Sequence, residues 1–229
     1  MAEPLTGPSS HTNQATLIER FDSVLYPVDL RTLLDRLPEL GWLVPLRADE
    51  DQGISLTDAP TKGNSRLRIN MGNKTLGVTS NDLSEALENY RELRQSILDL
   101  GHLSPEVKTD YVEFRYIGWI RGQSSPVQVF SSWWSGYERV VALGKHLGAR
   151  LSTDVEALSP HGIRFAPAGL DANRPNWAEL TLVPLSMSGT QLYSFDLLYR
   201  NEDSEMVEAV AETADDLIES VIGTLEETQ

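Results

Sequence analysis

The sequence predicts an α+β fold made of two similar halves, each running strand, helix, antiparallel strands, helix. The first observation is periodicity. Segments in which apolar and polar residues alternate are interspersed with segments whose apolar residues recur every three or four positions. The second is an internal match, because residues 80–92 and 200–212 share one Asn, one Ser and three Glu at positions 120 residues apart. We therefore expect an internal duplication, a pseudo-two-fold arrangement and a sheet covered on one face by helices.

The first half is expected to span residues 16–105 and to open with a strand over 16–26. Leucines spaced at i, i+3, i+4 and i+7 predict a helix from residue 29 to 38. A short strand near residue 55 and a hairpin over 66–79, turning at Gly72-Asn73, follow. A helix capped by Ser80 or Asn81 closes this half, and its buried stripe is formed by Leu83, Ala86, Leu87, Tyr90, Leu93 and Ile97.

The second half is expected to span residues 106–229. Its strand over 112–121 is apolar on both faces and rich in aromatic and β-branched residues, which predicts a central position in the sheet. Residues 127–147 read as one helix that buries Phe130, Trp134, Tyr137 and Val141 on a single stripe. Strands near 164–165, 177–183 and 191–199 follow, and a final helix from Ser204 to about Leu225 carries acidic residues opposite its apolar stripe.

The predicted order of elements is similar to that of ferredoxin-like and TATA-box-binding-protein-like duplicated folds. The similarity concerns architecture alone and implies no function. The two halves form either two separate repeats or one continuous domain.

The ends of the chain and its composition narrow the class of protein. Residues 1–15 are rich in Pro, Ser, Gly, Thr and Asn and lack the pattern of a signal peptide, so they are predicted to form a disordered leader. No segment approaches the apolar length of a membrane-spanning helix. The absence of cysteine excludes disulfides and thiolate metal sites. A cytoplasmic location is the simplest expectation.

Charge is distributed unevenly along the chain, whose net charge is −15. Residues 59–81 contain four basic residues and no acidic ones, whereas residues 201–229 contain ten acidic residues and no basic ones. The overall field repels nucleic acid and anionic membranes, which disfavours nucleic acid as a partner, and no membrane association is expected. The excess of acidic residues is also typical of proteins that remain in solution at high salt.

Two surfaces are candidates for binding a partner. Lys62, Arg66, Arg68 and Lys74 on the predicted hairpin would bind an anionic group, such as an acidic helix of a partner or the chain's own C-terminal helix. The alternative is an ordinary solvated sheet face. Trp133 and Trp134 point about 100° apart on a helix, so one of them is a candidate exposed anchor, unless both pack in the core.

A third candidate site lies within the predicted strands. Glu113, Arg115, Glu179 and Asp196 are charged residues in otherwise apolar strands, and neighbouring strands would bring them together on one sheet face. Such a group would perform acid–base chemistry or hold a polar ligand, or else form a structural ion-pair network. The four histidines have no metal-binding spacing, and no nucleotide-binding or nucleophile motif is present, so no metal or cofactor is expected.

These observations favour a non-catalytic, cytoplasmic binding or regulatory protein, either self-associating as a homodimer or bound to another protein through the basic hairpin and the tryptophan region. The alternative is an enzyme or small-ligand-binding protein that uses Glu113, Arg115, Glu179 and Asp196. A third interpretation, nucleic-acid binding through the concave sheet, conflicts with the net charge.

Overall fold

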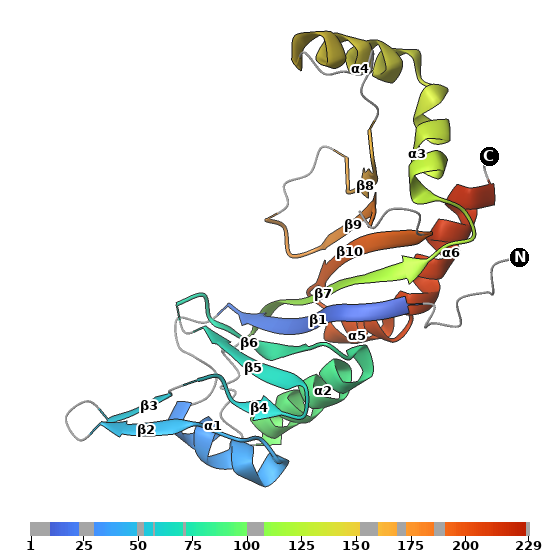
Figure 1. Ribbon diagram of the computed structural model, residues 1–229. Helices are drawn as coiled ribbons and strands as arrows, with labels where there is room; N and C mark the ends of the chain where they lie inside the picture. Colours follow the sequence, from blue (N-terminus) through green and yellow to red (C-terminus); the bar gives the residue numbers. More distant parts are fainter. Residues whose placement is uncertain are drawn as a thin grey trace, which may run out of the picture.

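The computed structural model describes residues 10–22, 30–49, 53–56, 58–70, 72–99, 108–151, 160–168, 173–185 and 191–227. They form an α+β structure around one open, eight-stranded antiparallel sheet (Figure 1). In spatial order its strands are β4 (Thr61–Lys62), β5 (Ser65–Asn70), β6 (Thr75–Ser80), β1 (Ser10–Phe21), β7 (Thr109–Arg121), β10 (Leu192–Asn201), β9 (Trp177–Pro184) and β8 (Ile163–Phe165). A separate hairpin pairs β2 (Leu46–Asp49) with β3 (Gly53–Leu56).

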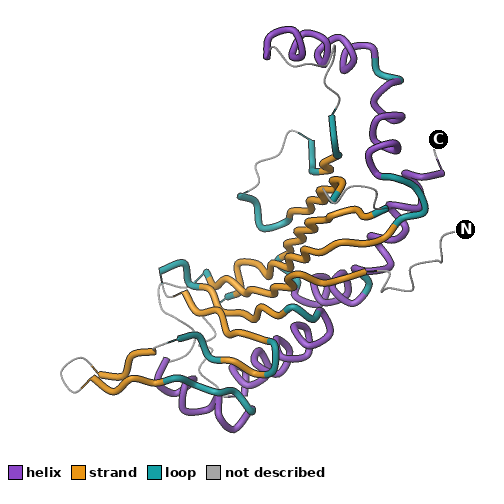
Figure 2. Tube along the Cα trace, viewed as in Figure 1, coloured by secondary structure: helices purple, strands orange, loops and turns teal. Residues whose placement is uncertain are grey.

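Helices cover one face of this sheet. The α-helices are α1 (Leu30–Arg36), α2 (Leu83–Asp99), α3 (Pro126–Ser135), α4 (Glu138–Leu151), α5 (Ser204–Glu212) and α6 (Ala214–Glu227), and the 3-10 helix η1 (Leu37–Leu40) continues α1. Figure 2 shows α2, α5 and α6 behind the sheet, and no helix of the described residues packs on the opposite face. We call that opposite face the open face.

Alternation along the strands decides which side chains reach the helices. In β7, Val112, Phe114 and Tyr116 are buried beneath the helix layer, while the residues between them lie on the open face. The predicted central position of this strand is confirmed, because β1 and β10 pair with its two edges. The inner face and the helices form one continuous hydrophobic core.

The hairpin and its following helix also agree with prediction. β5 and β6 pair with Leu67 opposite Val78 and Ile69 opposite Leu76, with these side chains facing the core. In α2 the predicted stripe is buried, with Leu83 only partly so. Its cap is neither Ser80 nor Asn81: the backbone N–H of Glu85 donates to the Asp82 carboxylate at 2.8 Å.

The first strand begins earlier than predicted. β1 starts at Ser10, so residues 10–15 of the expected leader belong to the sheet, while residues 1–9 lie outside the described residues. The reason is non-local: β7 is long enough to pair Ser10 with Ile120 and His11 with Trp119. The polar composition of this segment therefore did not identify it as a strand.

Each of the two long helices predicted for the second half is divided in two. α3 ends before Gly136, so Tyr137 and Val141 lie exposed on or beside α4, and the prediction that they are buried with Phe130 is wrong. The last helix breaks at Thr213, where the hydroxyl donates to the carbonyl of Ala209 at 3.0 Å. Such a side-chain bond to the preceding turn favours a bend.

The strand order is the same on both sides of the centre. β1 and β7 are adjacent, and the sheet continues through β6, β5 and β4 on one side and through β10, β9 and β8 on the other. The matched segments at the starts of α2 and α5 are nevertheless out of register, because their caps Asp82 and Asp203 are 121 residues apart rather than 120. The sequence match thus reflects the capping chemistry that helix starts share, and duplication stays a prediction.

Candidate functional site: the open face of the sheet

The open face gathers positive charge from strands far apart in sequence. Strand register brings seven arginines to this face, namely Arg20, Arg66, Arg68, Arg115, Arg121, Arg164 and Arg200. The carboxylates on or beside it are fewer, namely Asp110, Glu113, Glu179 and Asp196. The described part of the open face therefore carries more arginines than carboxylates, although the chain as a whole has a net charge of −15.

The helix layer carries the opposite charge. α5 and α6 together contain eight acidic residues and no basic residue. Glu208 and Glu212 of α5 bind Arg91 of α2, with N–O distances of 2.7 and 2.6 Å. Because α5 and α6 lie behind the sheet, the prediction that the C-terminal helix docks on the basic hairpin of the same chain is wrong (Figure 1).

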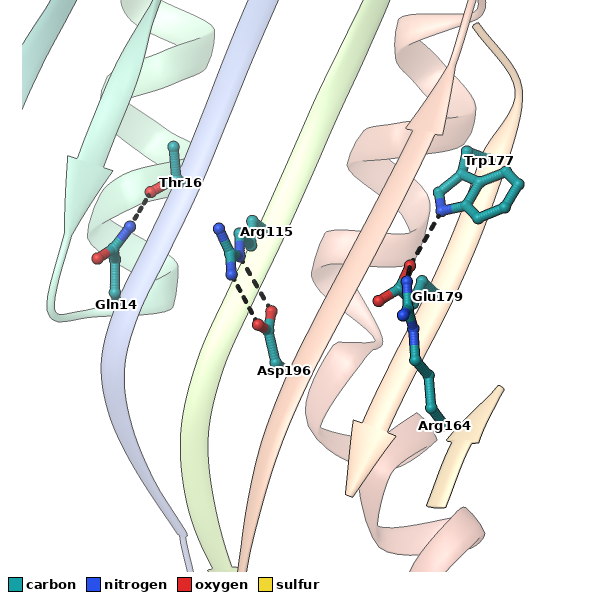
Figure 3. Close-up of polar contacts among 7 residues, drawn as sticks. All are labelled: Gln14, Thr16, Arg115, Arg164, Trp177, Glu179 and Asp196. Carbon is teal, nitrogen blue, oxygen red and sulfur yellow. Dashed lines mark hydrogen bonds and ion pairs between the residues drawn. The ribbon is translucent and has the colours of Figure 1, made fainter. Parts of the chain in front are cut away.

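The carboxylates predicted as an acid–base cluster are instead held in ion pairs. Arg115 donates to both oxygens of Asp196, from Nε at 3.0 Å and Nη2 at 2.7 Å, and this hydrogen bonding raises the pKa of Arg115 (Figure 3). Arg164 donates to Glu179 at 2.7 Å. Glu113 is paired with Arg200. The four predicted residues thus share one face, but each carboxylate has its own arginine.

Two arginines of the hairpin have no such ion pair with a described residue. Arg66 and Arg68 are exposed, and no carboxylate of the described residues lies within ion-pair distance of either. Arg68 donates from Nε to the Thr79 hydroxyl at 3.1 Å, which leaves its terminal nitrogens available. This contact continues a polar row across the strands, because Thr79 bonds Thr16 at 2.9 Å and Thr16 accepts from Gln14 at 3.0 Å.

The two lysines of the predicted basic hairpin are placed differently. Lys62 of β4 lies on the helix side of the sheet and forms an ion pair with Glu92 of α2. Lys74 is half-buried in the turn, at a φ of 55°. The four cations therefore do not project from one surface, and the anion-binding candidate reduces to Arg66 and Arg68.

A hollow of about 420 Å³, lined by both polar and apolar side chains, lies beside Arg68 on the open face. The hairpin side contributes Arg68, Asn70, Asn73 and Thr75, and β1 and β7 supply the other wall, including Glu113 and Arg115. Amide and guanidinium groups line this hollow, together with the carboxylate of Glu113. At its edge, the guanidinium of Arg200 lies 4.4 Å from the centre of the Tyr111 ring, a cation–π contact that fixes both side chains.

Neither tryptophan of the predicted anchor is exposed. Trp133 and Trp134 are half-buried on α3 and pack against the hydrophobic core. The Trp134 ring lies 5.8 Å from that of Tyr137. Figure 1 places α3 at the opposite end of the sheet from β5, so the tryptophans and the hairpin arginines do not form one surface.

The sequence analysis named Arg115 but missed the other two partner arginines, Arg164 and Arg200. Arg200 follows Asp196 by four positions in the same strand, so strict alternation places both on one face. Arg164 is the central residue of the short strand β8 and was not connected to Glu179. Identifying these pairs requires the strand order, which the sequence does not provide.

Comparisons with known proteins leave the open face as the main guide to function. A scan of protein-family models finds no match, and searches of curated proteins and of solved structures find none either. Within the described residues, no group of three His, Asp or Glu side chains is arranged to hold a metal ion. No helix in that part of the chain is long and apolar enough to cross a membrane.

Proposed function

We propose that this chain is a non-catalytic binding protein whose open face takes up an acidic segment of a partner protein. The observation that carries the proposal is that Arg66 and Arg68 are exposed, form no ion pair with any described carboxylate, and lie beside a hollow on a face with excess positive charge. Arginine suits this role because its planar group binds carboxylates in two-point contacts.

The charge distribution favours a short acidic segment over a nucleic acid. A long polyanion would extend past the sheet and meet the field of a chain with net charge −15. A peptide segment experiences mainly the local field, since charges beyond about 10 Å are screened at 0.1 M salt. The enzyme alternative is less favoured, because Arg115, Arg164 and Arg200 occupy the carboxylate oxygens that acid–base chemistry would need.

Two further parts of the proposal concern origin and location. We attribute the matching strand order on the two sides of β1 and β7 to duplication of an ancestral half. We also place the protein in the cytoplasm. The chain has no cysteine, so it does not depend on an oxidising compartment for disulfides.

Binding of a labelled polyglutamate peptide tests the function directly. We expect the wild-type chain to bind it at low salt and the Arg66→Ser/Arg68→Ser variant to lose about tenfold or more in affinity, because each charged hydrogen bond contributes about 1.5–3 kcal/mol. Fluorescence anisotropy at several salt concentrations measures the loss. Affinity should also fall as salt rises.

The matched control is Arg31→Ser/Arg36→Ser, which removes the same charge from α1 and should retain binding. Equal losses in both double variants would mean that only net charge matters and would overturn the proposed site. Absence of polyglutamate binding at low salt would contradict the proposal. Tighter binding of polyuridylate than of polyglutamate, lost in the Arg66/Arg68 variant, would instead assign the face to nucleic acid.

Releasing a paired arginine should strengthen binding. Asp196→Asn removes the charge that holds Arg115, whose side chain is about half exposed, and thereby adds a free cation to the face. Because exposed ion pairs contribute about 0.2–1 kcal/mol, we expect the affinity for polyglutamate to rise about two- to fivefold with little change in stability. Glu219→Gln on α6 removes one negative charge behind the sheet and should leave the affinity unchanged. A loss of affinity in the Asp196 variant would show that the carboxylate itself contributes to the site.

A further inference from the structure

An apolar groove of about 470 Å³ lies on the helix side of the second half, between β8, β9, β10 and α6. Phe165 of β8 lines one side of it, and Leu217 and Val221 of α6 line the other. The lining includes one charged residue, Glu179, whose carboxylate is turned to the open face and bound there by Arg164 at 2.7 Å. Phe165 and Leu217 are 43 and 41% exposed. The fold thus leaves apolar side chains together in contact with water, which is typical of a binding surface.

The two halves of the sheet differ in how their outer strands are covered. In the first half, α1 and η1 follow β1, Leu37 is fully buried, and Leu43 just after η1 is bridged to Thr61 of β4. In the second half, α3 follows β7 but lies at the other end of β9 and β10 from the groove, where the Phe130 ring contacts that of Tyr193 (Figure 1). No helix of the described residues fills the groove itself. A helix is therefore the element that this architecture uses to cover such a surface.

The charge of α6 indicates what kind of helix fits the groove. α6 carries five acidic residues and no basic one. Two of them, Asp215 and Glu226, accept hydrogen bonds from tyrosines of the sheet. The other three, Asp216, Glu219 and Glu227, are exposed, and no described basic side chain forms an ion pair with them. A basic partner is therefore attracted to this helix and an acidic one is repelled.

Helix geometry places two of these carboxylates along the groove. Successive residues of an α-helix are about 100° apart, so Asp216 and Glu227 both lie about 80–100° from Leu217, on the solvent side. The buried residues Ile218 and Ile222 lie on the other side of Leu217, toward the sheet. A helix whose apolar face entered the groove would bring basic residues at the edge of that face close to Asp216 and Glu227.

We propose that the β8–β9–α6 groove is a docking site for a basic amphipathic helix of a partner protein. The apolar face of that helix packs between Phe165 and Leu217, and its lysines or arginines pair with Asp216 and Glu227. Groove-to-groove pairing of two copies of this chain is disfavoured, because each α6 carries the same five negative charges. The groove is on the helix side of the sheet, so this site is separate from the arginines of the open face and does not depend on their function.

A labelled peptide of about 18 leucine and lysine residues, with leucines at i, i+3, i+4 and i+7, tests the groove. We expect the wild-type chain to bind it at low salt, as measured by fluorescence anisotropy. Phe165→Ser/Leu217→Ser should weaken binding about tenfold or more, because two apolar side chains are lost from the contact. Asp216→Asn/Glu227→Gln should weaken it about two- to tenfold, as expected for exposed ion pairs. Circular dichroism verifies that each variant is folded.

Matched variants and peptides separate the groove from the general acidity of the chain. Leu43→Ser alters an exposed leucine of the first half, and Asp35→Asn/Glu88→Gln removes two exposed carboxylates from α1 and α2. Both should bind the peptide as the wild type does. A peptide of the same composition, with its leucines shuffled so that no apolar face forms, should bind at least about tenfold more weakly.

Several results would overturn the proposal. Equal binding of the shuffled peptide, or equal losses in the two carboxylate variants, would mean that only net charge matters. Absence of binding at low salt, or tighter binding of a leucine–glutamate peptide with the same spacing, would contradict the proposed partner. Binding of anilinonaphthalene sulfonate, lost in the Phe165/Leu217 variant while the peptide does not bind, would assign the groove to a small apolar ligand. A wild-type dimer in sedimentation velocity that Leu217→Ser dissociates would assign it to a second copy.

Discussion

Gly77→Ala is expected to destabilise the protein by about 3 kcal/mol, the upper part of the range for overpacking a buried site. Gly77 lies in β6 opposite Ile18 of β1. A Cβ at this position would lie 2.1 Å from the carbonyl oxygen of Leu17 and 2.7 Å from the Cα of Ile18. Both are backbone atoms, so the added methyl group separates two paired strands instead of displacing a flexible side chain.

The comparison that isolates this effect is Gly223→Ala, in α6. Nothing lies within 4 Å of a Cβ built at Gly223, so alanine there should stabilise the protein by up to about 1 kcal/mol through helix propensity. Urea unfolding of both variants measures the two changes. If Gly77→Ala proved as stable as wild type, β1 and β6 would have to lie farther apart than the structure places them.

The close approach at Gly77 also serves the candidate site. Gly77 pairs with Arg68 on the other edge of β6, and both positions lie on the open face. Without a side chain at Gly77, the guanidinium of Arg68 can lie across β6 and reach Thr79. The strand spacing that makes this glycine necessary therefore also positions the arginine that is central to the proposed binding function.

Local patterns predicted the faces of the strands but not their order. Alternation in β7 correctly separated Phe114 from Glu113 and Arg115 because side-chain direction depends only on position within a strand. The pairing of Arg115 with Asp196 depends on β10 lying next to β7, a contact between residues 81 positions apart. Such contacts follow from the packing of the whole chain, so the sequence indicated the participating residues and not their partners.

Helix continuity was overestimated for a related reason. An apolar stripe continues through Phe130, Trp134, Tyr137 and Val141, and periodicity alone reads it as one helix. The structure ends α3 at Ser135 and directs α4 away from the sheet, so the later members of the stripe have no core to enter. The period of apolar residues predicts that a helix has an apolar face. It does not predict whether the rest of the chain covers that face.

Raising the pH above 10 is expected to destabilise the protein steeply because three buried tyrosines resist ionisation. Burial raises the pKa of Tyr90, Tyr116 and Tyr193 above the ordinary value of 10. In the unfolded chain these phenols lose their protons first, so the unfolded state binds fewer protons and stability falls as pH rises. Above pH 10, each tyrosine lowers the free energy of unfolding by at most about 1.4 kcal/mol per pH unit. The stability that each protonated tyrosine contributes is fully present below pH 10.

Phenylalanine substitutions assign this slope to particular side chains. Tyr116→Phe and Tyr193→Phe should each flatten the loss of stability between pH 10 and 11.5 by up to about 1.4 kcal/mol per pH unit, while costing about 1 kcal/mol at neutral pH through a lost hydrogen bond. Tyr137→Phe, at an exposed position, is the control and should keep the wild-type slope. Urea unfolding at each pH supplies the free energies.

The two tyrosines also indicate where alkaline unfolding begins. Tyr116 donates its hydroxyl to Asp215 at 2.7 Å, and Tyr193 donates to Glu226 at 3.1 Å, so both phenols attach α6 to the sheet. Ionising either one replaces a hydrogen bond with repulsion between two negative groups. Hydrogen exchange above pH 10 should therefore accelerate in α6 before it does in β7. Uniform acceleration across both elements, or a slope unaffected by both substitutions, would contradict this origin of the pH dependence.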